Sequence, residues 1–459
     1  MMTTITYQNF RLLLCLALVA THLSCKKYLE EKPDQKLAVP KSLTELQGLL
    51  DNFSVLNQTD AGAGEASSDN YYLDYQDWQA IPYADEQRIY TWEKDNLFAL
   101  DGRTNEWYCN YQAVYYCNTV LSALNKVPRN VGNQWNWDNI KGQALFFRGQ
   151  YFLRSLTLWA PAYDPQSSSR DLGIPLRLTD DFNPLSDRAS VESSYQQILK
   201  DLSESARLLP EKASHPAHPS KPASYGLLAR ANLSMRKYPQ AEAYADSSLN
   251  LYNKLMDYNE LNVTSDFPFQ QFNAEVILWN RILAPGLLAP YIAKIDPELY
   301  NSYSSDDLRK QAFFFANSDG SHSFKGYYEQ LTAPFGGIAV DEIILTKAES
   351  AARNGKLAQA MTSLNELMSK RIKKDKFTAI TASSASEALN LILNERRKEL
   401  LMRDLRWMDI KRLNKEGANI ILSRKLGDQI LTLPANDPRY ALPIPEDVIR
   451  LSGIPQNPR

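Results

Sequence analysis

The chain has 459 residues, 44% hydrophobic and 23% charged, so it can bury a sizeable core as one large unit or several smaller ones. Its formal net charge of −2 lacks the basic footprint of nucleic-acid-binding proteins, and we expect no nucleic-acid partner. The 25 tyrosines and 8 tryptophans outnumber the 4 histidines, which favours aromatic surfaces over metal or acid–base sites.

Residues 1–24 have the pattern of a signal peptide. The apolar run over 10–20 is interrupted only by Arg11 and is too short to span a bilayer. The small Ser24 precedes Cys25, as a lipoprotein signal peptidase requires, and we predict that Cys25 carries the lipid anchor. Because His22 stands where leucine is usual, an ordinary secretory signal is the alternative.

The stretch 67–78, SSDNYYLDYQDW, has neither helical nor strand periodicity. Its rings stand beside carboxylates and an amide, the combination that stacks on sugar faces and bonds sugar hydroxyls. The alternative is that the rings pack this loop onto the body of the protein. The ligand candidates here are Asp69, Asn70, Tyr71, Tyr72, Tyr75 and Trp78.

Two long apolar patterns predict a helical hairpin. The first covers 91–127 and is rich in aromatics, which we interpret as core rather than ligand contacts. The second begins after Asp138 and stops at Pro161. Cys109 and Cys117, eight residues apart on the first helix, would lie about 12 Å apart along its axis. That separation is too long for a disulfide, so we expect two core thiols.

An internal repeat aligns residues 223–251 with 341–371, pairing Ala229 with Ala348 and Lys237 with Lys356. Small residues at the expected helix crossings make both copies similar to tetratricopeptide units, although the period is not continuous. We therefore predict a mainly α fold, in which tetratricopeptide-like helix pairs form a scaffold with long irregular loops and a few short strands.

The insertion over 256–340 separates the two copies and is broken by prolines. Long irregular insertions in helical scaffolds are often functional, which makes Tyr291, Tyr303 and Tyr327 further ligand candidates. Packing within the insertion is the alternative for each ring. His215 and His218 have no evident third ligand, and we predict neither a metal site nor a cofactor.

The stretch 394–414, NERRKELLMRDLRWMDIKRLN, predicts one long helix with a favourable ion pair from Glu399 to Arg403. An arginine on its apolar stripe, Arg397, must keep its charge, so the helix should lie at a charged, hydrogen-bonded seam. A structural role is favoured over a catalytic one.

This stretch resembles the C-terminal signature of the SusD/RagB family. The matching residues are Glu395, Arg396, Glu399, Leu400, Arg406, Trp407, Asp409 and Arg412, with Asp404 where glycine is usual. The segments 142–152 and 443–458 are similar to two further family blocks, and 25–33 to its mature N-terminus. The resemblance implies one domain over 25–459, with ligand-facing loops in 25–340 and the signature in 341–459.

The resemblance also implies a function. Members are surface-exposed lipoproteins of the outer membrane that deliver oligosaccharide to a SusC-like, TonB-dependent transporter, with peptide as the alternative cargo. A structural assembly partner without its own ligand is a third reading. We expect no catalysis, because the chain lacks the G-x-S-x-G, H-E-x-x-H and P-loop spacings.

Overall fold

The computed structural model describes residues 40–99, 103 and 105–459. The predicted signal peptide over 1–24 and the predicted anchor Cys25 lie outside these residues. Contacts divide the chain into Met1–Ser42 and Leu43–Arg459, and the helices and strands of the described residues lie in the second unit. No described helix is both long and apolar enough to cross a bilayer.

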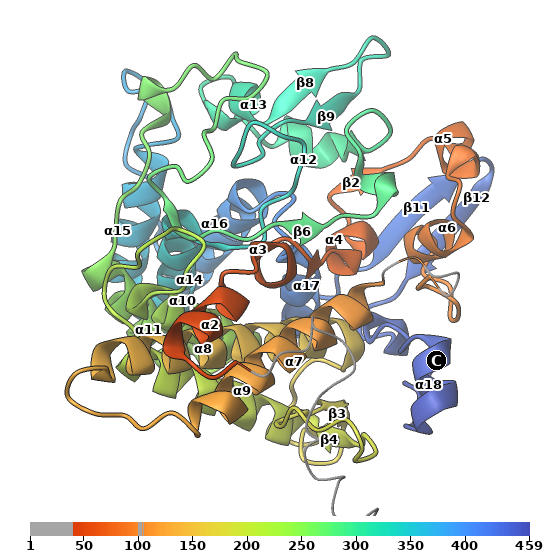
Figure 1. The fold of residues 1–459 in the computed structure, drawn as a ribbon. Coiled ribbons are helices and arrows are strands. Elements are labelled where there is room, and N and C mark those ends of the chain that lie inside the picture. Colours follow the sequence, from red (N-terminus) through yellow and green to blue (C-terminus); the bar gives the residue numbers. More distant parts are fainter. Residues whose placement is uncertain (1–39, 100–102, 104) are drawn as a thin grey trace, which may run out of the picture. The chain divides into compact units, whose positions relative to one another are not determined.

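Long helices stack side by side in chain order, and the prediction of a mainly α fold is confirmed (Figure 1). Each packs against its neighbours in sequence, and α11 also packs on α14 across the insertion. The stack consists of α7 (Glu106–Leu124), α8 (Gln134–Trp159), α9 (Val191–Leu208), α10 (Lys221–Ser234), α11 (Tyr238–Leu251), α14 (Val340–Arg353), α15 (Leu357–Met368) and α16 (Ala385–Glu399).

The first helix of the hairpin begins later than the sequence indicated. Its predicted start at Thr91 is wrong, because the Asn105 side chain accepts a hydrogen bond from the Tyr108 amide at 2.9 Å and caps α7 there. Cys109 and Cys117 are buried, free thiols on this helix, as expected.

The internal repeat is visible in the backbone of both helix pairs. Between α10 and α11, Arg236 adopts a left-handed φ of 59°, and the equivalent Gly355 between α14 and α15 has a φ of 76°. The amides of Lys237 and Lys356 each bond a carbonyl five residues earlier, at 2.9 Å. The two copies therefore turn by the same capping geometry, which strongly favours glycine.

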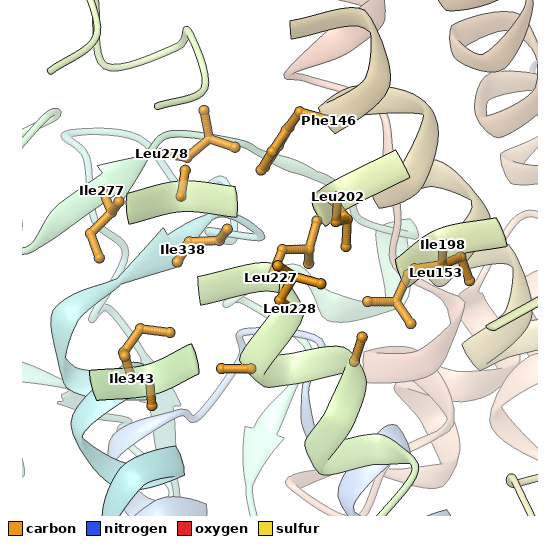
Figure 2. Packing of buried hydrophobic residues seen from close by; sticks show 14 of the residues in the cluster. Phe146, Leu153, Ile198, Leu202, Leu227, Leu228, Ile277, Leu278, Ile338 and Ile343 are labelled. Atoms are coloured by element: carbon orange, nitrogen blue, oxygen red, sulfur yellow. The ribbon is translucent and has the colours of Figure 1, made fainter. Parts of the chain in front are cut away.

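The core joins these helices to the insertion. Figure 2 shows aliphatic and aromatic side chains of α8, α9 and α10 meeting residues of the insertion and α14. Phe146, Leu202 and Leu227 come from the helices, and Leu278 and Ile338 from the insertion. Because these side chains are almost fully buried, the insertion is packed onto the stack rather than attached by its ends alone.

Short strands form two-stranded pairs, and two of these, β1 with β6 and β2 with β7, tie the insertion to other segments. The pairs are β1 (Asp60–Ala61) with β6 (Ile282–Leu283), β2 (Tyr71–Tyr72) with β7 (Lys294–Ile295), β3 (Leu172–Pro175) with β4 (Arg188–Ser190), β5 (Val276–Leu278) with β10 (Ile338–Ala339), β8 (Phe314–Ala316) with β9 (His322–Phe324), and β11 (Leu422–Leu426) with β12 (Gln429–Leu433).

Short helices complete the unit. They are α2 (Leu43–Leu50), α3 (Phe53–Leu56), α4 (Ala63–Ser67), α5 (Tyr75–Ala80), α6 (Ala84–Tyr90), α12 (Pro297–Asn301), α13 (Arg309–Ala312), α17 (Arg406–Asn414) and α18 (Glu446–Ser452), with 3-10 turns η2 (Tyr258–Glu260), η3 (Gly286–Leu288) and η4 (Pro438–Tyr440). In Figure 1 the insertion forms the upper part of the view.

The signature stretch is two helices, so the prediction of one long helix is wrong. α16 ends at Glu399 and α17 begins at Arg406, because Met402 and Asp404 between them adopt left-handed φ values of 58° and 54°. Glycine is the residue that tolerates this conformation best, which explains its usual place at position 404. The predicted ion pair between Glu399 and Arg403 is also wrong, because each of these two described residues forms its ion pairs with other partners.

The predicted charged seam is confirmed. The Arg396 Nε donates to Asp409 at 2.8 Å, and the same carboxylate accepts from Arg412. Arg412 is bidentate with Glu349 of α14, at 2.5 and 2.7 Å. Planar guanidinium groups satisfy buried carboxylates in this way, so α17 is fixed to α14 by charge-assisted bonds.

Buried carboxyl groups surround the junction at Asp404. Its side chain accepts bonds from the Glu65 amide at 2.8 Å and from Arg154 at 3.0 Å. Burial raises the pKa of Asp404 to about 7 and that of Glu106 to about 8. Burial disfavours the charged form of a carboxyl group, and here few cations compensate.

We predict that Gly355→Ala lowers the free energy of unfolding by about 1 kcal/mol, because Gly355 has a positive φ that alanine adopts at a cost. A Cβ at this position meets nothing within 4 Å, so backbone conformation alone is tested. Gly48→Ala is the matched control, since it lies within α2 and also has open space. Chemical denaturation should show the control unchanged or up to about 1 kcal/mol more stable.

We predict that Glu106→Gln becomes increasingly stabilising as pH rises from 5 to 9. The pKa of Glu106 is about 8 in the folded chain against a usual 4.5, so its favourable contribution is complete below pH 4.5 and is lost as pH rises through 8. Each pKa unit corresponds to about 1.4 kcal/mol, which makes the effect on the order of a few kcal/mol at pH 9. Melting temperatures of parent and variant across this range test it; a constant difference would contradict it.

Candidate functional site

The two segments predicted to contact ligand lie together. β2 pairs antiparallel with β7, so that Tyr72 stands opposite Lys294 and Tyr71 opposite Ile295. The Asp296 amide continues the contact by donating to the Asn70 carbonyl at 3.0 Å. The stretch 67–78 and the insertion therefore form one surface.

A polar cleft of about 310 Å³ opens at this junction. Its lining comes from β2, β7, α12 and the turn between β8 and β9. The residues are Tyr72, Asp74, Lys294, Ile295, Pro297, Tyr300, Asn301, Asp319, Gly320, Ser321 and His322. We refer to this set as the polar cleft.

A lysine between two carboxylates sets the charge of the polar cleft. The Lys294 Nζ donates to Asp319 at 2.8 Å and also to Asp74. These hydrogen bonds raise the pKa of Lys294, and its ammonium lowers the pKa of Asp319. Lys294 and Asp319 are therefore ionised at neutral pH, and together with Asp74 they place hydrogen-bond donors and acceptors side by side.

Ring faces lie beside this charged group. Tyr300 stacks on His322 with 3.5 Å between ring centroids and 17° between planes. Burial and the charge of Lys310 lower the pKa of His322, so its imidazole is neutral at pH 7. The Tyr72 ring is half-buried at the cleft. Flat apolar faces next to hydrogen-bonding groups are what a sugar ring requires.

Four of the predicted ligand contacts are buried, namely Asn70, Tyr71, Tyr303 and Tyr327. The Asn70 amide donates to Glu65 at 2.7 Å, and the two hydroxyls of Tyr71 and Tyr303 donate to backbone carbonyls. In this conformation these side chains have no face to offer a ligand at the surface. They pack the loop and the insertion, which was the alternative for each.

Asp69 is engaged in a structural ion pair. Its carboxylate accepts two bonds from Arg406 at 2.7 and 2.8 Å and lies 3.3 Å from Arg397. Although burial opposes the charged form, the Arg406 guanidinium holds the pKa of Asp69 well below its usual range. The seam of the signature stretch thus reaches the loop that enters the polar cleft.

The accessible candidates are Tyr72, Tyr75, Trp78 and Tyr291. Tyr75 and Trp78 stack with centroids 6.1 Å apart, and Tyr75 is 44% exposed. Tyr291, which is 84% exposed, lies three residues before the start of β7. These four rings lie in the two segments that meet at β2 and β7, which the sequence analysis identified without showing their contact.

A group of three carboxylates close enough to share a metal ion exists among the described residues: Glu275, Asp341 and Glu399. Arg371 donates to Glu275 and Glu399 at 2.7 Å each. The Tyr328 hydroxyl lies between Glu275 and Asp341, at 2.8 and 2.9 Å. These partners already satisfy the carboxylates, so the group fits a buried ion network better than a metal.

A larger groove, which was not predicted from the sequence, lies elsewhere, on α7. It has a volume of about 740 Å³ and is bounded by α7, the loop over 176–186 and α18. We call the set formed by Trp107, Tyr108, Tyr111, Gln112, Tyr115, Phe182, Asn183, Leu185, Val448 and Leu451 the aromatic groove. The signal was present: Tyr108, Tyr111 and Tyr115 recur at helical spacing on one face.

Profiles of known protein families confirm the predicted resemblance. A profile of SusD-like proteins, described as starch-binding and associating with the outer membrane, matches residues 27–233, and the SusD family profile matches 340–458. The chain belongs to the SusD/RagB family. Comparison with curated protein sequences finds no match.

Solved structures of this family share the fold. A SusD superfamily protein from Bacteroides thetaiotaomicron VPI-5482 has a TM-score of 0.74 at 20% identity, covering 91% of this chain and 100% of its own. A SusD-like carbohydrate binding protein from Bacteroides vulgatus ATCC 8482 has 0.67 at 20%, covering 90% and 97%. A laminarin binding SusD-like protein has 0.63 at 19%, covering 90% and 98%.

Proposed function

We propose that this protein binds oligosaccharide at the polar cleft. The observation that carries the proposal is the junction of β2 and β7, where the Tyr72 ring and the stacked rings of Tyr300 and His322 stand beside the Lys294 ion pairs. Sugars present apolar C–H faces and hydroxyls together, and this arrangement is complementary to both. Family members of the same fold that are described as carbohydrate binding or laminarin binding support a glycan as cargo.

Binding is favoured over catalysis by the state of the cleft carboxylates. A glycosidase needs one carboxyl group with a raised pKa to act as general acid. In the polar cleft both Asp74 and Asp319 accept bonds from Lys294, and the pKa of Asp319 is lowered. Neither carboxylate has the environment of a proton donor.

Family membership and the sequence of residues 1–25 support a proposal for the cellular role. We propose that the protein lies at the outer membrane, held on the cell surface by a lipid on Cys25, and caps a SusC-like, TonB-dependent transporter. Cargo would pass on when the cap closes onto the transporter. A peptide cargo, or a purely structural partnership with the transporter, are the alternatives.

We predict that Tyr72→Ala weakens binding to a neutral glycan about tenfold, because one ring face and its apolar contact are lost. A glycan and peptide array identifies the cargo, and calorimetry then measures the dissociation constant. Trp135→Ala is the control, since Trp135 is 64% exposed and lies outside the polar cleft. An unchanged melting temperature separates ligand contact from packing.

The alternatives give different outcomes in the same experiment. Binding of peptides but no glycan on the array would establish the peptide cargo. If the parent binds neither class yet copurifies with its transporter, the structural role is correct and the proposed function is not.

We predict that Cys25→Ala abolishes lipid labelling and releases the protein from the membrane fraction, because this thiol is the proposed site of lipid attachment. Metabolic labelling with a fatty-acid analogue measures this directly. Cys15→Ala serves as the control and should retain the label. Labelling that survives Cys25→Ala would assign the anchor to another residue.

A further inference from the structure

The aromatic groove is distinct from the polar cleft. Its walls are α7, the loop over 176–186 and α18, none of which lines the polar cleft. Figure 1 places α18 at the lower right and α12, with β2 beside it, in the upper part of the view. The two sites share no lining residue.

The loop wall of the groove is held in place before any ligand arrives. Arg177 donates to the carbonyls of Pro184 at 2.7 Å and Asp181 at 2.6 Å, which closes the loop on itself. The Asn118 side chain donates to the Arg177 carbonyl at 2.8 Å, and this bond ties the loop to α7. Phe182 then lies with its ring 5.6 Å from that of Tyr115. A preorganised wall lowers the entropy cost of binding.

The charges of the groove favour a neutral occupant. Arg177 uses its guanidinium on the carbonyls of its own loop. Asp181 accepts from the Asn183 amide and side chain, and Asp447 accepts from the Val448 amide. Each of these three charged side chains of the lining therefore already hydrogen-bonds to neutral groups of its own segment, and none is directed at an ionic ligand in the groove.

The exposure of the rim favours an occupant with one apolar and one polar face. Phe182 is 68% exposed and Leu185 is 85% exposed, so a bound molecule would be covered on one side only. A lipid chain would leave apolar surface in water, whereas a pyranose would turn its hydroxyls outward. Gln112 donates to the Tyr108 hydroxyl at 3.1 Å, which leaves its side-chain carbonyl to accept from a sugar hydroxyl.

We propose that the aromatic groove is a second binding site for a neutral oligosaccharide, laid along α7. Tyr108, Tyr111 and Tyr115 repeat at three and four residues, a rise of about 4.5–6 Å, close to the length of one pyranose unit. Successive rings can thus support successive sugar units. The inference does not require that the polar cleft bind sugar.

The proposal is tested by calorimetric titration of the full mature chain with two neutral hexasaccharides, laminarihexaose and maltohexaose. Phe182→Ala should weaken one binding event about tenfold, and Tyr108→Ala should act on the same event. Trp135→Ala is the matched control at 64% exposure and should change nothing. Since Phe182 lies on an exposed loop, the melting temperature should stay constant.

Variants of the two sites separate the proposals. Loss of binding in Phe182→Ala with no effect of Tyr72→Ala supports the groove and refutes the cleft. Parent-like binding in both Phe182→Ala and Tyr108→Ala overturns the groove, as does failure of the parent to bind either hexasaccharide. Light scattering gives one more outcome that overturns the groove proposal. If the parent is a dimer, Phe182→Ala makes it monomeric and sugar binding is unchanged, the groove is a self-association surface.

Discussion

The Glu399 carboxylate is the contact on which the arrangement of the cleft depends. One oxygen accepts from Arg371 at 2.7 Å, next to the end of α15, and the other accepts from Arg309 at 2.9 Å, within the insertion. Both arginines are fully buried. Removing one member of such a group leaves an uncompensated buried charge, which typically costs about 3–5 kcal/mol. The insertion therefore cannot shift on the scaffold without breaking bonds to Glu399.

The signature stretch positions both walls of the polar cleft, not the insertion alone. After Glu399 the chain reverses through left-handed residues at 402 and 404, and α17 then presents Arg406 to Asp69, just before β2. Arg397 lies 3.3 Å from Asp69 and 4.0 Å from Asp296, next to β7. One short stretch thus fixes the loop and the insertion relative to each other. Residues that identify the family also place the candidate ligand surface.

The choice of Asp404 in place of glycine has a physical reason in this chain. An aspartate with a left-handed φ costs more conformational free energy than a glycine at this position, but the Asp404 carboxylate accepts hydrogen bonds from the Glu65 amide and from Arg154. A Cβ on Gly64 would come within 2.6 Å of that carboxylate, so α4 packs closely against it. The backbone cost at position 404 is offset by contacts that hold the loop before β2.

Much of the fold could be predicted from local patterns, whereas the site depended on contacts that such patterns do not encode. Apolar periodicity and the repeat of Lys237 and Lys356 predicted the helix pairs correctly, because both are local signals. The break after Glu399 was missed, since its stretch keeps helical periodicity and the left-handed turn is stabilised by distant residues. Tyr71 and Tyr72 are adjacent, yet pairing with β7 buries one and leaves the other at the cleft.

The two candidate surfaces are built on different physical principles. The polar cleft lies between segments far apart in sequence, so its shape depends on the buried ion network around Glu399 and Asp69. The aromatic groove is formed by one helix face and a loop closed by its own Arg177, with α18 at its end. Among the described residues, Glu399 and Asp69 form no ion pair with a residue of the groove. A change in this ion network should therefore alter the shape of the polar cleft more than that of the groove. The groove is the more locally determined surface, and its tyrosine spacing on α7 can be read from sequence once the helix start at Glu106 is known.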